Sequence, residues 1–452
     1  MIAGCGGGGG GGESGAAAAV PCSEAARKDF VYSVARDWYL FPELLPASVN
    51  LAEFATAEEL LDHLTATARE QGKDRYFSYL TTREADNTVL GEGEFIGFGF
   101  RMRNEAGDRP FILDVYEPSP AAAGGLERGD EIVAVDSGSG FVLVSDIVAT
   151  GGNVSDALGP SEVGVQRSLR LLRDGFTREV SLTKGTVTID PVPDSFGVRV
   201  LPLAGTTGVG YVNLRTYIST ADHQLRDAFA QLRASNLDYY IVDLRYNGGG
   251  LVGIAELLND LLGGARRPSD VQLRLLHNVM RSSEDSTRFF QPGGQSVSPV
   301  RIAFLTTDGT ASASEINVNS MKPWAEVAIV GSDTYGKPVG QLPFDLQGCQ
   351  DRLRLISFKT VNANGDGDYY AGLAETMPFA CAAEDTLDRP LGDAAEGMTA
   401  AALQWLQSGA CGAVIPPPAI AARAKAFEAL APDRYPLPRN PSAAQRLLPG
   451  LE

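Results

Sequence analysis

The sequence predicts an α/β protein of several domains, with a small helical domain and a β-rich module ahead of a core of alternating strands and helices. Its 452 residues exceed what one hydrophobic core usually organises. The hydrophobic fraction of 44% is typical of globular chains. The spacing of apolar residues also changes along the chain, from a helical period to short alternating runs and then to strands followed by helices.

The first expected domain is helical and covers residues 22–88. Phe30, Val34 and Trp38 recur every four residues, which places them on one face of a helix. A second helix is expected over 57–70. The aromatic side chains of this domain are interpreted as core residues rather than as ligand contacts.

A β-rich module is expected over residues 89–185, where short alternating apolar runs are separated by turn clusters. It contains the sequence Gly97-Phe98-Gly99-Phe100 and, further on, Leu126 and the run Gly129-Asp130-Glu131-Ile132. These segments together resemble a PDZ domain, in which a Gly-Phe-type loop offers backbone N–H groups to the terminal carboxylate of a peptide.

The PDZ resemblance implies a peptide-binding site at Gly97, Phe98, Gly99 and Phe100. The strand that follows this loop would offer its edge to an added β-strand. The alternative is a structural β-module that binds no peptide.

The core is expected over residues 186–412, because strands and helices alternate there. The expected strands are Val209–Leu214, Tyr239–Leu244, Val300–Leu305, Val327–Val330, Leu353–Val361 and Tyr369–Gly372, and the expected helices are Thr220–Leu232, Leu251–Leu262 and Ser312–Met321. Residues 413–452 are interpreted as a Pro-rich extension that wraps on the surface, with a short helix near Ala421–Leu430.

Composition excludes several classes of function. Lysine and arginine number 38 against 56 aspartates and glutamates, and the net charge of −18 repels nucleic acid. No apolar stretch reaches the length of about 18 residues that spans a bilayer, which excludes a multi-span membrane protein. The five cysteines form no CxxC pair and the three histidines are scattered, so no metal site and no cofactor is expected.

The N-terminus, Ile2-Ala3-Gly4-Cys5, resembles a bacterial lipobox and is followed by a glycine run from Gly6 to Gly12. This resemblance implies lipidation at Cys5, a tether over residues 1–21, and a place on the periplasmic or surface side of a bacterial cell envelope. Membrane contact is then expected only through the lipid at Cys5. The alternative is a plain low-complexity segment.

The other cysteines are Cys22, Cys349, Cys381 and Cys411. In an oxidising compartment they could form two disulfides, whose connectivity the sequence leaves open. Pairing of Cys349 with Cys381 is the first hypothesis, and four unpaired thiols in a cytosolic protein are the alternative.

The chemistry is expected around the run from Thr310 to Glu315, where Ser312 stands at a strand-to-helix junction. Taken alone, Ser312 could be a helix cap. Gly336-Lys337 and then Gln341 follow the next strand, and an earlier strand ends in the run from Asp243 to Gly250. In this order the motifs resemble the C-terminal processing, or tail-specific, serine peptidases, over roughly Phe30 to Gln407.

The family resemblance implies a crotonase-like or ClpP-like core and endopeptidase activity through an acyl-enzyme, with protein or peptide substrates. Ser312 matches the nucleophile, Lys337 the general base and Gln341 the residue that orients the lysine. A lysine acts as a base only when it is neutral, so its surroundings must lower a pKa that is ordinarily about 10.4. Gln341 can accept a hydrogen bond from the amine without adding a negative charge.

An oxyanion needs fixed backbone donors, which glycines leave accessible. Gly248 or Gly249 together with Ala313 are the candidate donors, and the sequence does not decide between the two glycines. Pro338 departs from the glycine usual in the family, and it favours an extended Lys337.

Several alternatives compete with this interpretation. A histidine triad would use His223 or His277 as its base. The run from Asn362 to Asp368 hints at a calcium loop but lacks the expected glutamate, so a hairpin turn is preferred. At the level of the whole protein, the alternatives are a catalytically silent peptide-binding scaffold and an acyl-thioester enzyme on the same fold. The oligomeric state is not predicted.

Overall fold

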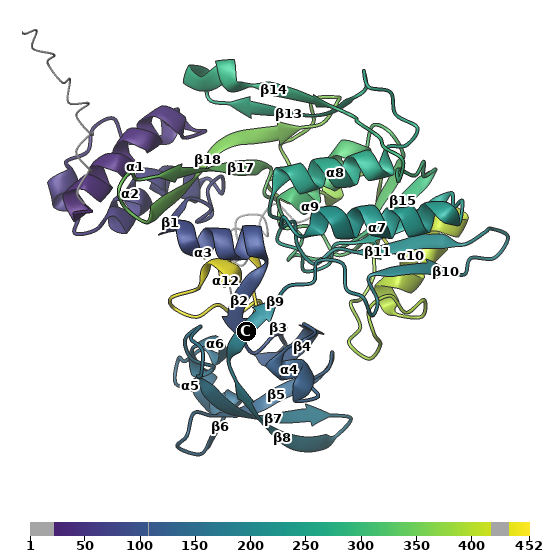
Figure 1. Ribbon diagram of the computed structural model, residues 1–452, viewed down its shortest axis with the longest axis horizontal. Coiled ribbons are helices and arrows are strands. Elements are labelled where there is room, and N and C mark those ends of the chain that lie inside the picture. Colours follow the sequence, from purple (N-terminus) through teal and green to yellow (C-terminus); the bar gives the residue numbers. More distant parts are fainter. Residues whose placement is uncertain (1–21, 107, 417–433) are drawn as a thin grey trace, which may run out of the picture.

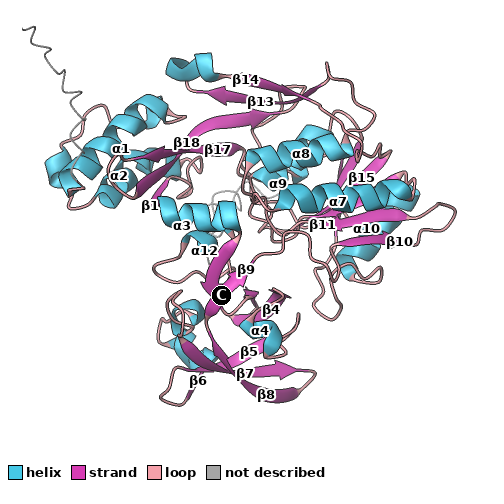
Figure 2. Ribbon diagram, in the orientation of Figure 1, coloured by secondary structure: helices cyan, strands magenta, loops and turns pink. Residues whose placement is uncertain are grey.

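The computed structural model describes residues 22–106, 108–416 and 434–452, and it has three parts (Figure 1). A helical N-terminal domain lies on one side, a mixed α/β core on the other, and a β-rich domain below them. Figure 2 shows that helices cover the core while strands dominate the lower domain. The expected α/β class, with a helical domain and a β-rich insertion, is confirmed.

The N-terminal domain is built on helices α1 (Glu24–Trp38) and α2 (Ala57–Glu70), with short 3-10 turns at Pro42–Leu44 and Leu51–Glu53. The side chains of Ser23 and Thr56 accept hydrogen bonds from the first turns of α1 and α2. Both helices pack their apolar faces on the sheet that contains β18 (Asp351–Val361). The expected second helix, 57–70, is confirmed.

The central sheet of the core follows the order β10-β11-β12-β15-β16-β19, and its last five strands are parallel. Its strands are β10 (Val198–Leu201), β11 (Val209–Asn213), β12 (Tyr239–Asp243), β15 (Arg301–Thr306), β16 (Glu326–Gly331) and β19 (Phe379–Ala382). Its helices are α7 (Ala221–Ala234), α8 (Val252–Leu262), α9 (Ala313–Met321) and α10 (Gly397–Ser408).

Both faces of this sheet are covered, as parallel sheets require. Val212 and Val242 face the cluster that contains α7, α8 and α9, whereas Tyr211 and Ile241 face the cluster around Trp405 of α10. Neighbouring residues therefore point to opposite faces, which explains the nearly continuous apolar runs in the sequence.

A second sheet joins the core to the N-terminal domain, with β18 pairing β1, β13 and β17. It contains β1 (Tyr79–Thr82), β13 (Val271–His277), β14 (Ser286–Phe289), β17 (Val339–Asp345) and β18. The strand expected at Tyr369–Gly372 is wrong, because these residues form a turn whose Gly372 N–H donates to Tyr369 O. A glycine at φ +104° ends that apolar run before it can extend.

The β-rich domain is linked to the core by helix α3 (Arg83–Asn87), a π-turn (Thr88–Glu92), and a ribbon of β2 (Glu94–Gly97) and β9 (Gly185–Thr188). Its sheet runs β3-β4-β5-β7-β8, with β6 paired to β5. The strands are β3 (Phe100–Glu105), β4 (Arg109–Val115), β5 (Glu131–Asp136), β6 (Phe141–Leu143), β7 (Gln166–Arg173) and β8 (Phe176–Thr183). The helices are α4 (Pro120–Ala123), α5 (Val144–Ala149) and α6 (Val154–Ala157). We call residues 97–185 the PDZ-like domain.

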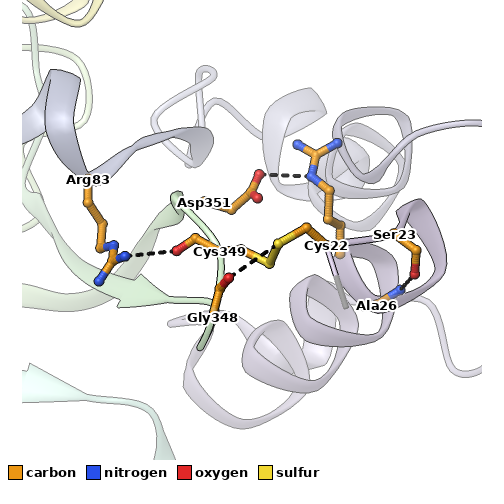
Figure 3. The surroundings of a disulfide bond; sticks show 8 residues. Cys22, Ser23, Ala26, Arg83, Gly348, Cys349 and Asp351 are labelled. Atoms are coloured by element: carbon orange, nitrogen blue, oxygen red, sulfur yellow. Dashed lines mark hydrogen bonds and ion pairs between the residues drawn. A yellow bond between two sulfur atoms is a disulfide. The ribbon is translucent and has the colours of Figure 1, made fainter. Parts of the chain in front are cut away.

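Two disulfides are present, Cys22–Cys349 and Cys381–Cys411. The first ties the start of α1 to the loop between β17 and β18 (Figure 3). The hypothesis that Cys349 pairs with Cys381 is wrong, because Cys349 lies in the loop between β17 and β18 whereas Cys381 lies in β19 of the central sheet. The alternative of four free thiols is wrong as well. The two disulfides join cysteines that are 327 and 30 residues apart in the sequence, and the spacing of the cysteines does not predict which of them pair.

The described C-terminal segment, residues 434–452, includes helix α12 (Ala443–Leu447) and returns to the junction between the core and the PDZ-like domain (Figure 1). Leu451 and Glu452 are buried there, which differs from the expected surface wrap. The helix expected near 421–430, the tether and Cys5 lie outside the described residues. Within the described ranges, no helix has the length and apolarity to cross a membrane.

Candidate active site

Ser312 lies between β15 and α9, and its backbone adopts φ +57° and ψ −114°. A positive φ is rare for a residue with a side chain, and such strain persists only where the surroundings hold it. The surroundings here include Gly249, at which a Cβ would lie 2.8 Å from the Ser312 Cβ. The hydroxyl-bearing side chain is half-buried at the N-terminus of the helix.

Glu315 connects the two expected catalytic segments. Its carboxylate accepts hydrogen bonds from the Ser312 N–H at 2.8 Å, the Gly336 N–H at 2.7 Å and the Lys337 N–H at 2.8 Å. The side chain is fully buried, and burial raises the pKa of its carboxyl while these hydrogen bonds oppose the rise. The sequence carried a signal for the contact between Ser312 and Glu315, because a serine followed three residues later by a glutamate is the pattern of a capping box.

Lys337 lies in the loop before β17, with its Nζ 3.1 Å from Gln341 Oε1. The Nζ also lies 4.7 Å from the centre of the Phe77 ring. Burial lowers the pKa of the Lys337 amine to about 8, and the negative charges of Asp74 and Glu315 oppose this shift. The structure thus brings Lys337 and Gln341 together, as expected.

The N-terminal domain completes the surroundings of the lysine, which the sequence did not indicate. The Gln341 amide donates to Phe77 O, so its oxygen is turned toward the lysine. The Arg75 guanidinium donates to Tyr335 O at 2.9 Å and Gly336 O at 2.5 Å. Residues 74–77 and 335–341 are too far apart in the chain for a local pattern to connect them.

The glycine loop after β12 approaches Ser312 from the other side. Gly249 N–H donates to the Asn247 side chain at 2.9 Å, so this candidate donor already has an acceptor. In the described part of the chain, the N–H groups of Gly248 and Ala313 donate to no acceptor. The carbonyl oxygen of Leu447 lies close to Gly248, 2.3 Å from where a Cβ would be.

Pro338 fits this arrangement without breaking it. The Lys337 N–H still reaches Glu315, and Pro338 O accepts from Thr360 N–H at 3.1 Å. Proline has no backbone N–H, and the hydrogen bonds around Pro338 do not require one.

The histidines and the loop after β18 show other environments. His223 is exposed on α7, and His277 packs between Trp38 and Phe358 at the end of β13. Asn362 closes the loop after β18 by accepting from Asn364 and Asp366 N–H groups. Among the described residues, no cluster of three histidine, cysteine, aspartate or glutamate side chains could hold a metal ion.

The Gly97-Phe98-Gly99-Phe100 loop lies at the start of β3. The N–H groups of Gly99 and Phe100 donate to a main-chain oxygen of Glu452 at 2.7 and 3.2 Å. The side chains of Phe98 and Phe100 are buried in the domain core and stack 6.3 Å apart. The loop therefore holds a main-chain oxygen with its backbone and keeps its aromatic rings inside.

The fold of the chain is shared with a solved structure. The crystal structure of a putative S41 protease from Bacteroides fragilis matches with a TM-score of 0.67 and 22% identity, over 84% of this chain and 97% of that one. At this identity the likeness concerns the fold.

Sequence comparisons place the chain within a family. Residues 208–372 match the model of peptidase family S41, and residues 26–79 match the S41 N-terminal domain. Carboxyl-terminal-processing proteases of Picosynechococcus and Synechocystis are 26% and 28% identical, each over 57% of this chain. The matches span 58% and 56% of those relatives. These matches support the C-terminal processing serine peptidase family.

Proposed function

We propose that this protein is a serine endopeptidase that works through Ser312 and Lys337. The observation that carries the proposal is the environment of Lys337, an amine with a lowered pKa, held by a neutral amide and tied through Glu315 to the backbone of Ser312. Family membership and the S41-type fold support the same function.

In the first step, Ser312 Oγ attacks the carbonyl carbon of a peptide bond while its proton passes to Lys337 Nζ. The tetrahedral intermediate then collapses, the C–N bond breaks, and the lysine returns the proton to the leaving amine. Water attacks the resulting ester by the same route and releases the acid. The net reaction consumes one water and needs no cofactor.

The neutral amine is available near neutral pH because of its surroundings. With a pKa of about 8, roughly a tenth of the lysine is neutral at pH 7, whereas an ordinary lysine has well under a thousandth. Gln341 is suited to orient the amine because an amide oxygen accepts its hydrogen bond without stabilising the ammonium as strongly as a carboxylate would.

The oxyanion is proposed to bind the N–H groups of Gly248 and Ala313. Both are free of acceptors among the described residues, whereas Gly249 N–H is held by Asn247. Ala313 also begins α9, so the helix dipole adds positive potential at this place. Gly249 instead serves by leaving room for the strained Ser312 backbone.

The PDZ-like domain is proposed to capture the C-terminal ends or apolar segments of protein substrates by strand addition. A backbone oxygen already lies in its glycine loop, which supports this role. Activity on the outer side of a bacterial membrane is also proposed, because two disulfides suit an oxidising compartment. The proposed lipid at Cys5 lies outside the described residues.

The test is mass spectrometry of peptides with varied C-termini, incubated with the wild type and with the Ser312→Ala and Lys337→Ala variants. We expect cuts by the wild type and none by either variant. Identical cuts by all three would overturn the assignment. A wild type that binds the peptides and cuts none would instead favour the silent scaffold.

A further inference from the structure

The last residues of this sequence lie along the edge of β3, where a peptide would be added to the PDZ-like sheet. Glu452 N–H donates to Phe100 O at 2.9 Å, and Met102 N–H donates to Gly450 O at 2.9 Å. Arg101 and Leu451 form an antiparallel bridge. The chain therefore supplies its own added strand, in the geometry of β-strand addition.

The side chain of Glu452 enters a polar pocket beside Lys184. The two side chains are 0% and 1% exposed, respectively, and Lys184 Nζ lies 3.9 Å from Glu452 Oε2. The amine also donates to Gly159 O at 2.8 Å and lies 5.0 Å from the centre of the Phe98 ring. A buried lysine is costly unless a partner of opposite charge faces it, so this pocket is built for an acidic residue.

The side chain of Leu451 enters an apolar pocket on the other side of the added strand. It belongs to a buried cluster with Phe95, Tyr116, Val187 and Ile189. Its carbonyl oxygen accepts from the Gln445 amide at 3.0 Å, which holds the segment in register. The two pockets thus distinguish the last residue from the one before it.

We propose that the groove selects peptides in which an aliphatic residue is followed by an acidic residue at the positions of Leu451 and Glu452, and that these two residues of this chain are its resident competitor. The proposal rests on the proposed function in one respect, since it takes the ligand of the groove to be a substrate of the Ser312 site.

The same C-terminal segment also covers the loops around Ser312. Leu447 O lies against Gly248, a proposed oxyanion donor. Arg434 pairs with Asp308 at 2.8 Å, and Tyr435 OH donates to Asp308 at 3.2 Å, in the loop that precedes Ser312. A peptide that displaces Leu451 and Glu452 would loosen the segment that covers Gly248, so capture in the groove opens the active site.

Binding is measured by fluorescence anisotropy on the full chain carrying Ser312→Ala, which removes cleavage. The probe is a labelled peptide with the sequence of residues 447–452, Leu-Leu-Pro-Gly-Leu-Glu, and the control probe ends in lysine instead. A Leu451→Asp/Glu452→Lys double variant removes the resident competitor. We expect it to bind the glutamate probe at least about tenfold more tightly than the single Ser312→Ala protein, because a tethered ligand competes at an effective concentration near the millimolar range.

Equal affinities of the two proteins for the glutamate probe would contradict the inference that Leu451 and Glu452 compete for the groove. Equal affinities of the double variant for the two probes would overturn the acidic preference. A Lys184→Glu change, added to the double variant, should reverse the preference between the probes, and Arg170→Glu on the exposed face of β7 is its matched control. If Lys184→Glu does not fold, Lys184→Met should remove the preference without reversing it, and a preference retained by Lys184→Met would contradict the pocket.

Cleavage assays with Ser312 intact separate the two proposals. Selective binding without any cleavage would contradict the proposed peptidase activity but would still support the selectivity of the groove. Cleavage without a preference for acidic ends, together with unselective binding, would contradict the selectivity of the groove. The proposed peptidase activity would still be supported.

Discussion

Two lysines of this protein, the buried Lys184 and the half-buried Lys337, have similar surroundings and different partners. Lys337 lies against the Phe77 ring and is held by the neutral amide of Gln341. Lys184 lies against the Phe98 ring and faces the carboxyl group of Glu452. Burial lowers the pKa of both amines, but Glu452 opposes this lowering at Lys184 directly.

This difference separates a base from a binding site. A lysine beside an amide can lose its proton near neutral pH, which a general base requires. At Lys184 burial lowers the pKa of the amine and raises the pKa of the facing Glu452 carboxyl to about 8, so the two groups are matched to each other, which suits recognition of an acidic residue. The partner of the amine, more than its burial, decides its role.

The largest expected effect is the loss of activity in Lys337→Ala. Without a base the Ser312 hydroxyl stays protonated during attack, so kcat/KM should fall by about a thousandfold or more. Lys337→Arg should be equally inactive, because a guanidinium does not become neutral. Peptide hydrolysis measures both, and Lys359→Ala on β18, a half-buried lysine near Asp368, should keep the wild-type rate.

A smaller effect is expected from Gln341→Glu, which gives Lys337 a partner like that of Lys184. The carboxylate favours the ammonium and raises the pKa of Lys337 above about 8. Activity depends on the neutral form, so the rising limb of the pH–rate profile should move to higher pH. A limb that lies about one pH unit higher should lower the rate at pH 7 about tenfold. An unmoved limb would show that the partner does not set this pKa.

Glu315→Gln should move the same limb in the opposite direction. The Glu315 charge raises the pKa of Lys337, so its removal should bring the limb to lower pH. The amide NH₂ would also face a backbone N–H, and the free energy of unfolding should fall by about 1–3 kcal/mol. Denaturant unfolding measures the loss, with the exposed Glu284→Gln as control.

The smallest effect is expected from Phe77→Leu. The ring favours the charged amine by about 0.5–1 kcal/mol, so its removal should lower the pKa of Lys337 only slightly. The rising limb of the pH–rate profile should then lie at slightly lower pH, and the maximal rate should be similar. A limb that moves to higher pH would mean that Phe77 acts mainly by excluding water.

The sequence was sufficient for much of the core, and it named the residues of the candidate site. Local periodicity predicted α2 and α8 almost to the residue, because each helix buries one continuous apolar face. The expected site residues Ser312 and Lys337 stand just before a helix and a strand, and Gln341 lies near the start of that strand, where motifs are local. The strand expected at Tyr369–Gly372 was wrong because a short apolar run does not distinguish a strand from a buried turn.

Other features depend on contacts between distant segments. The partners of the disulfides, the contact of Phe77 with Lys337, and the Glu315 bridge to Gly336 join residues that no local pattern relates. The choice of Gly248 over Gly249 depends on a hydrogen bond to Asn247, which spacing does not reveal.

The amino-acid order by itself determined the succession of helices and strands and the residue types available for catalysis, since both follow from neighbours a few positions apart. Only the tertiary structure decided which partner each of the two lysines received, and therefore that Lys337 resembles a base while Lys184 holds the chain's own Glu452. The physical reason is that a pKa depends on desolvation and on charges within a few ångströms, and folding assembles both from remote parts of the chain.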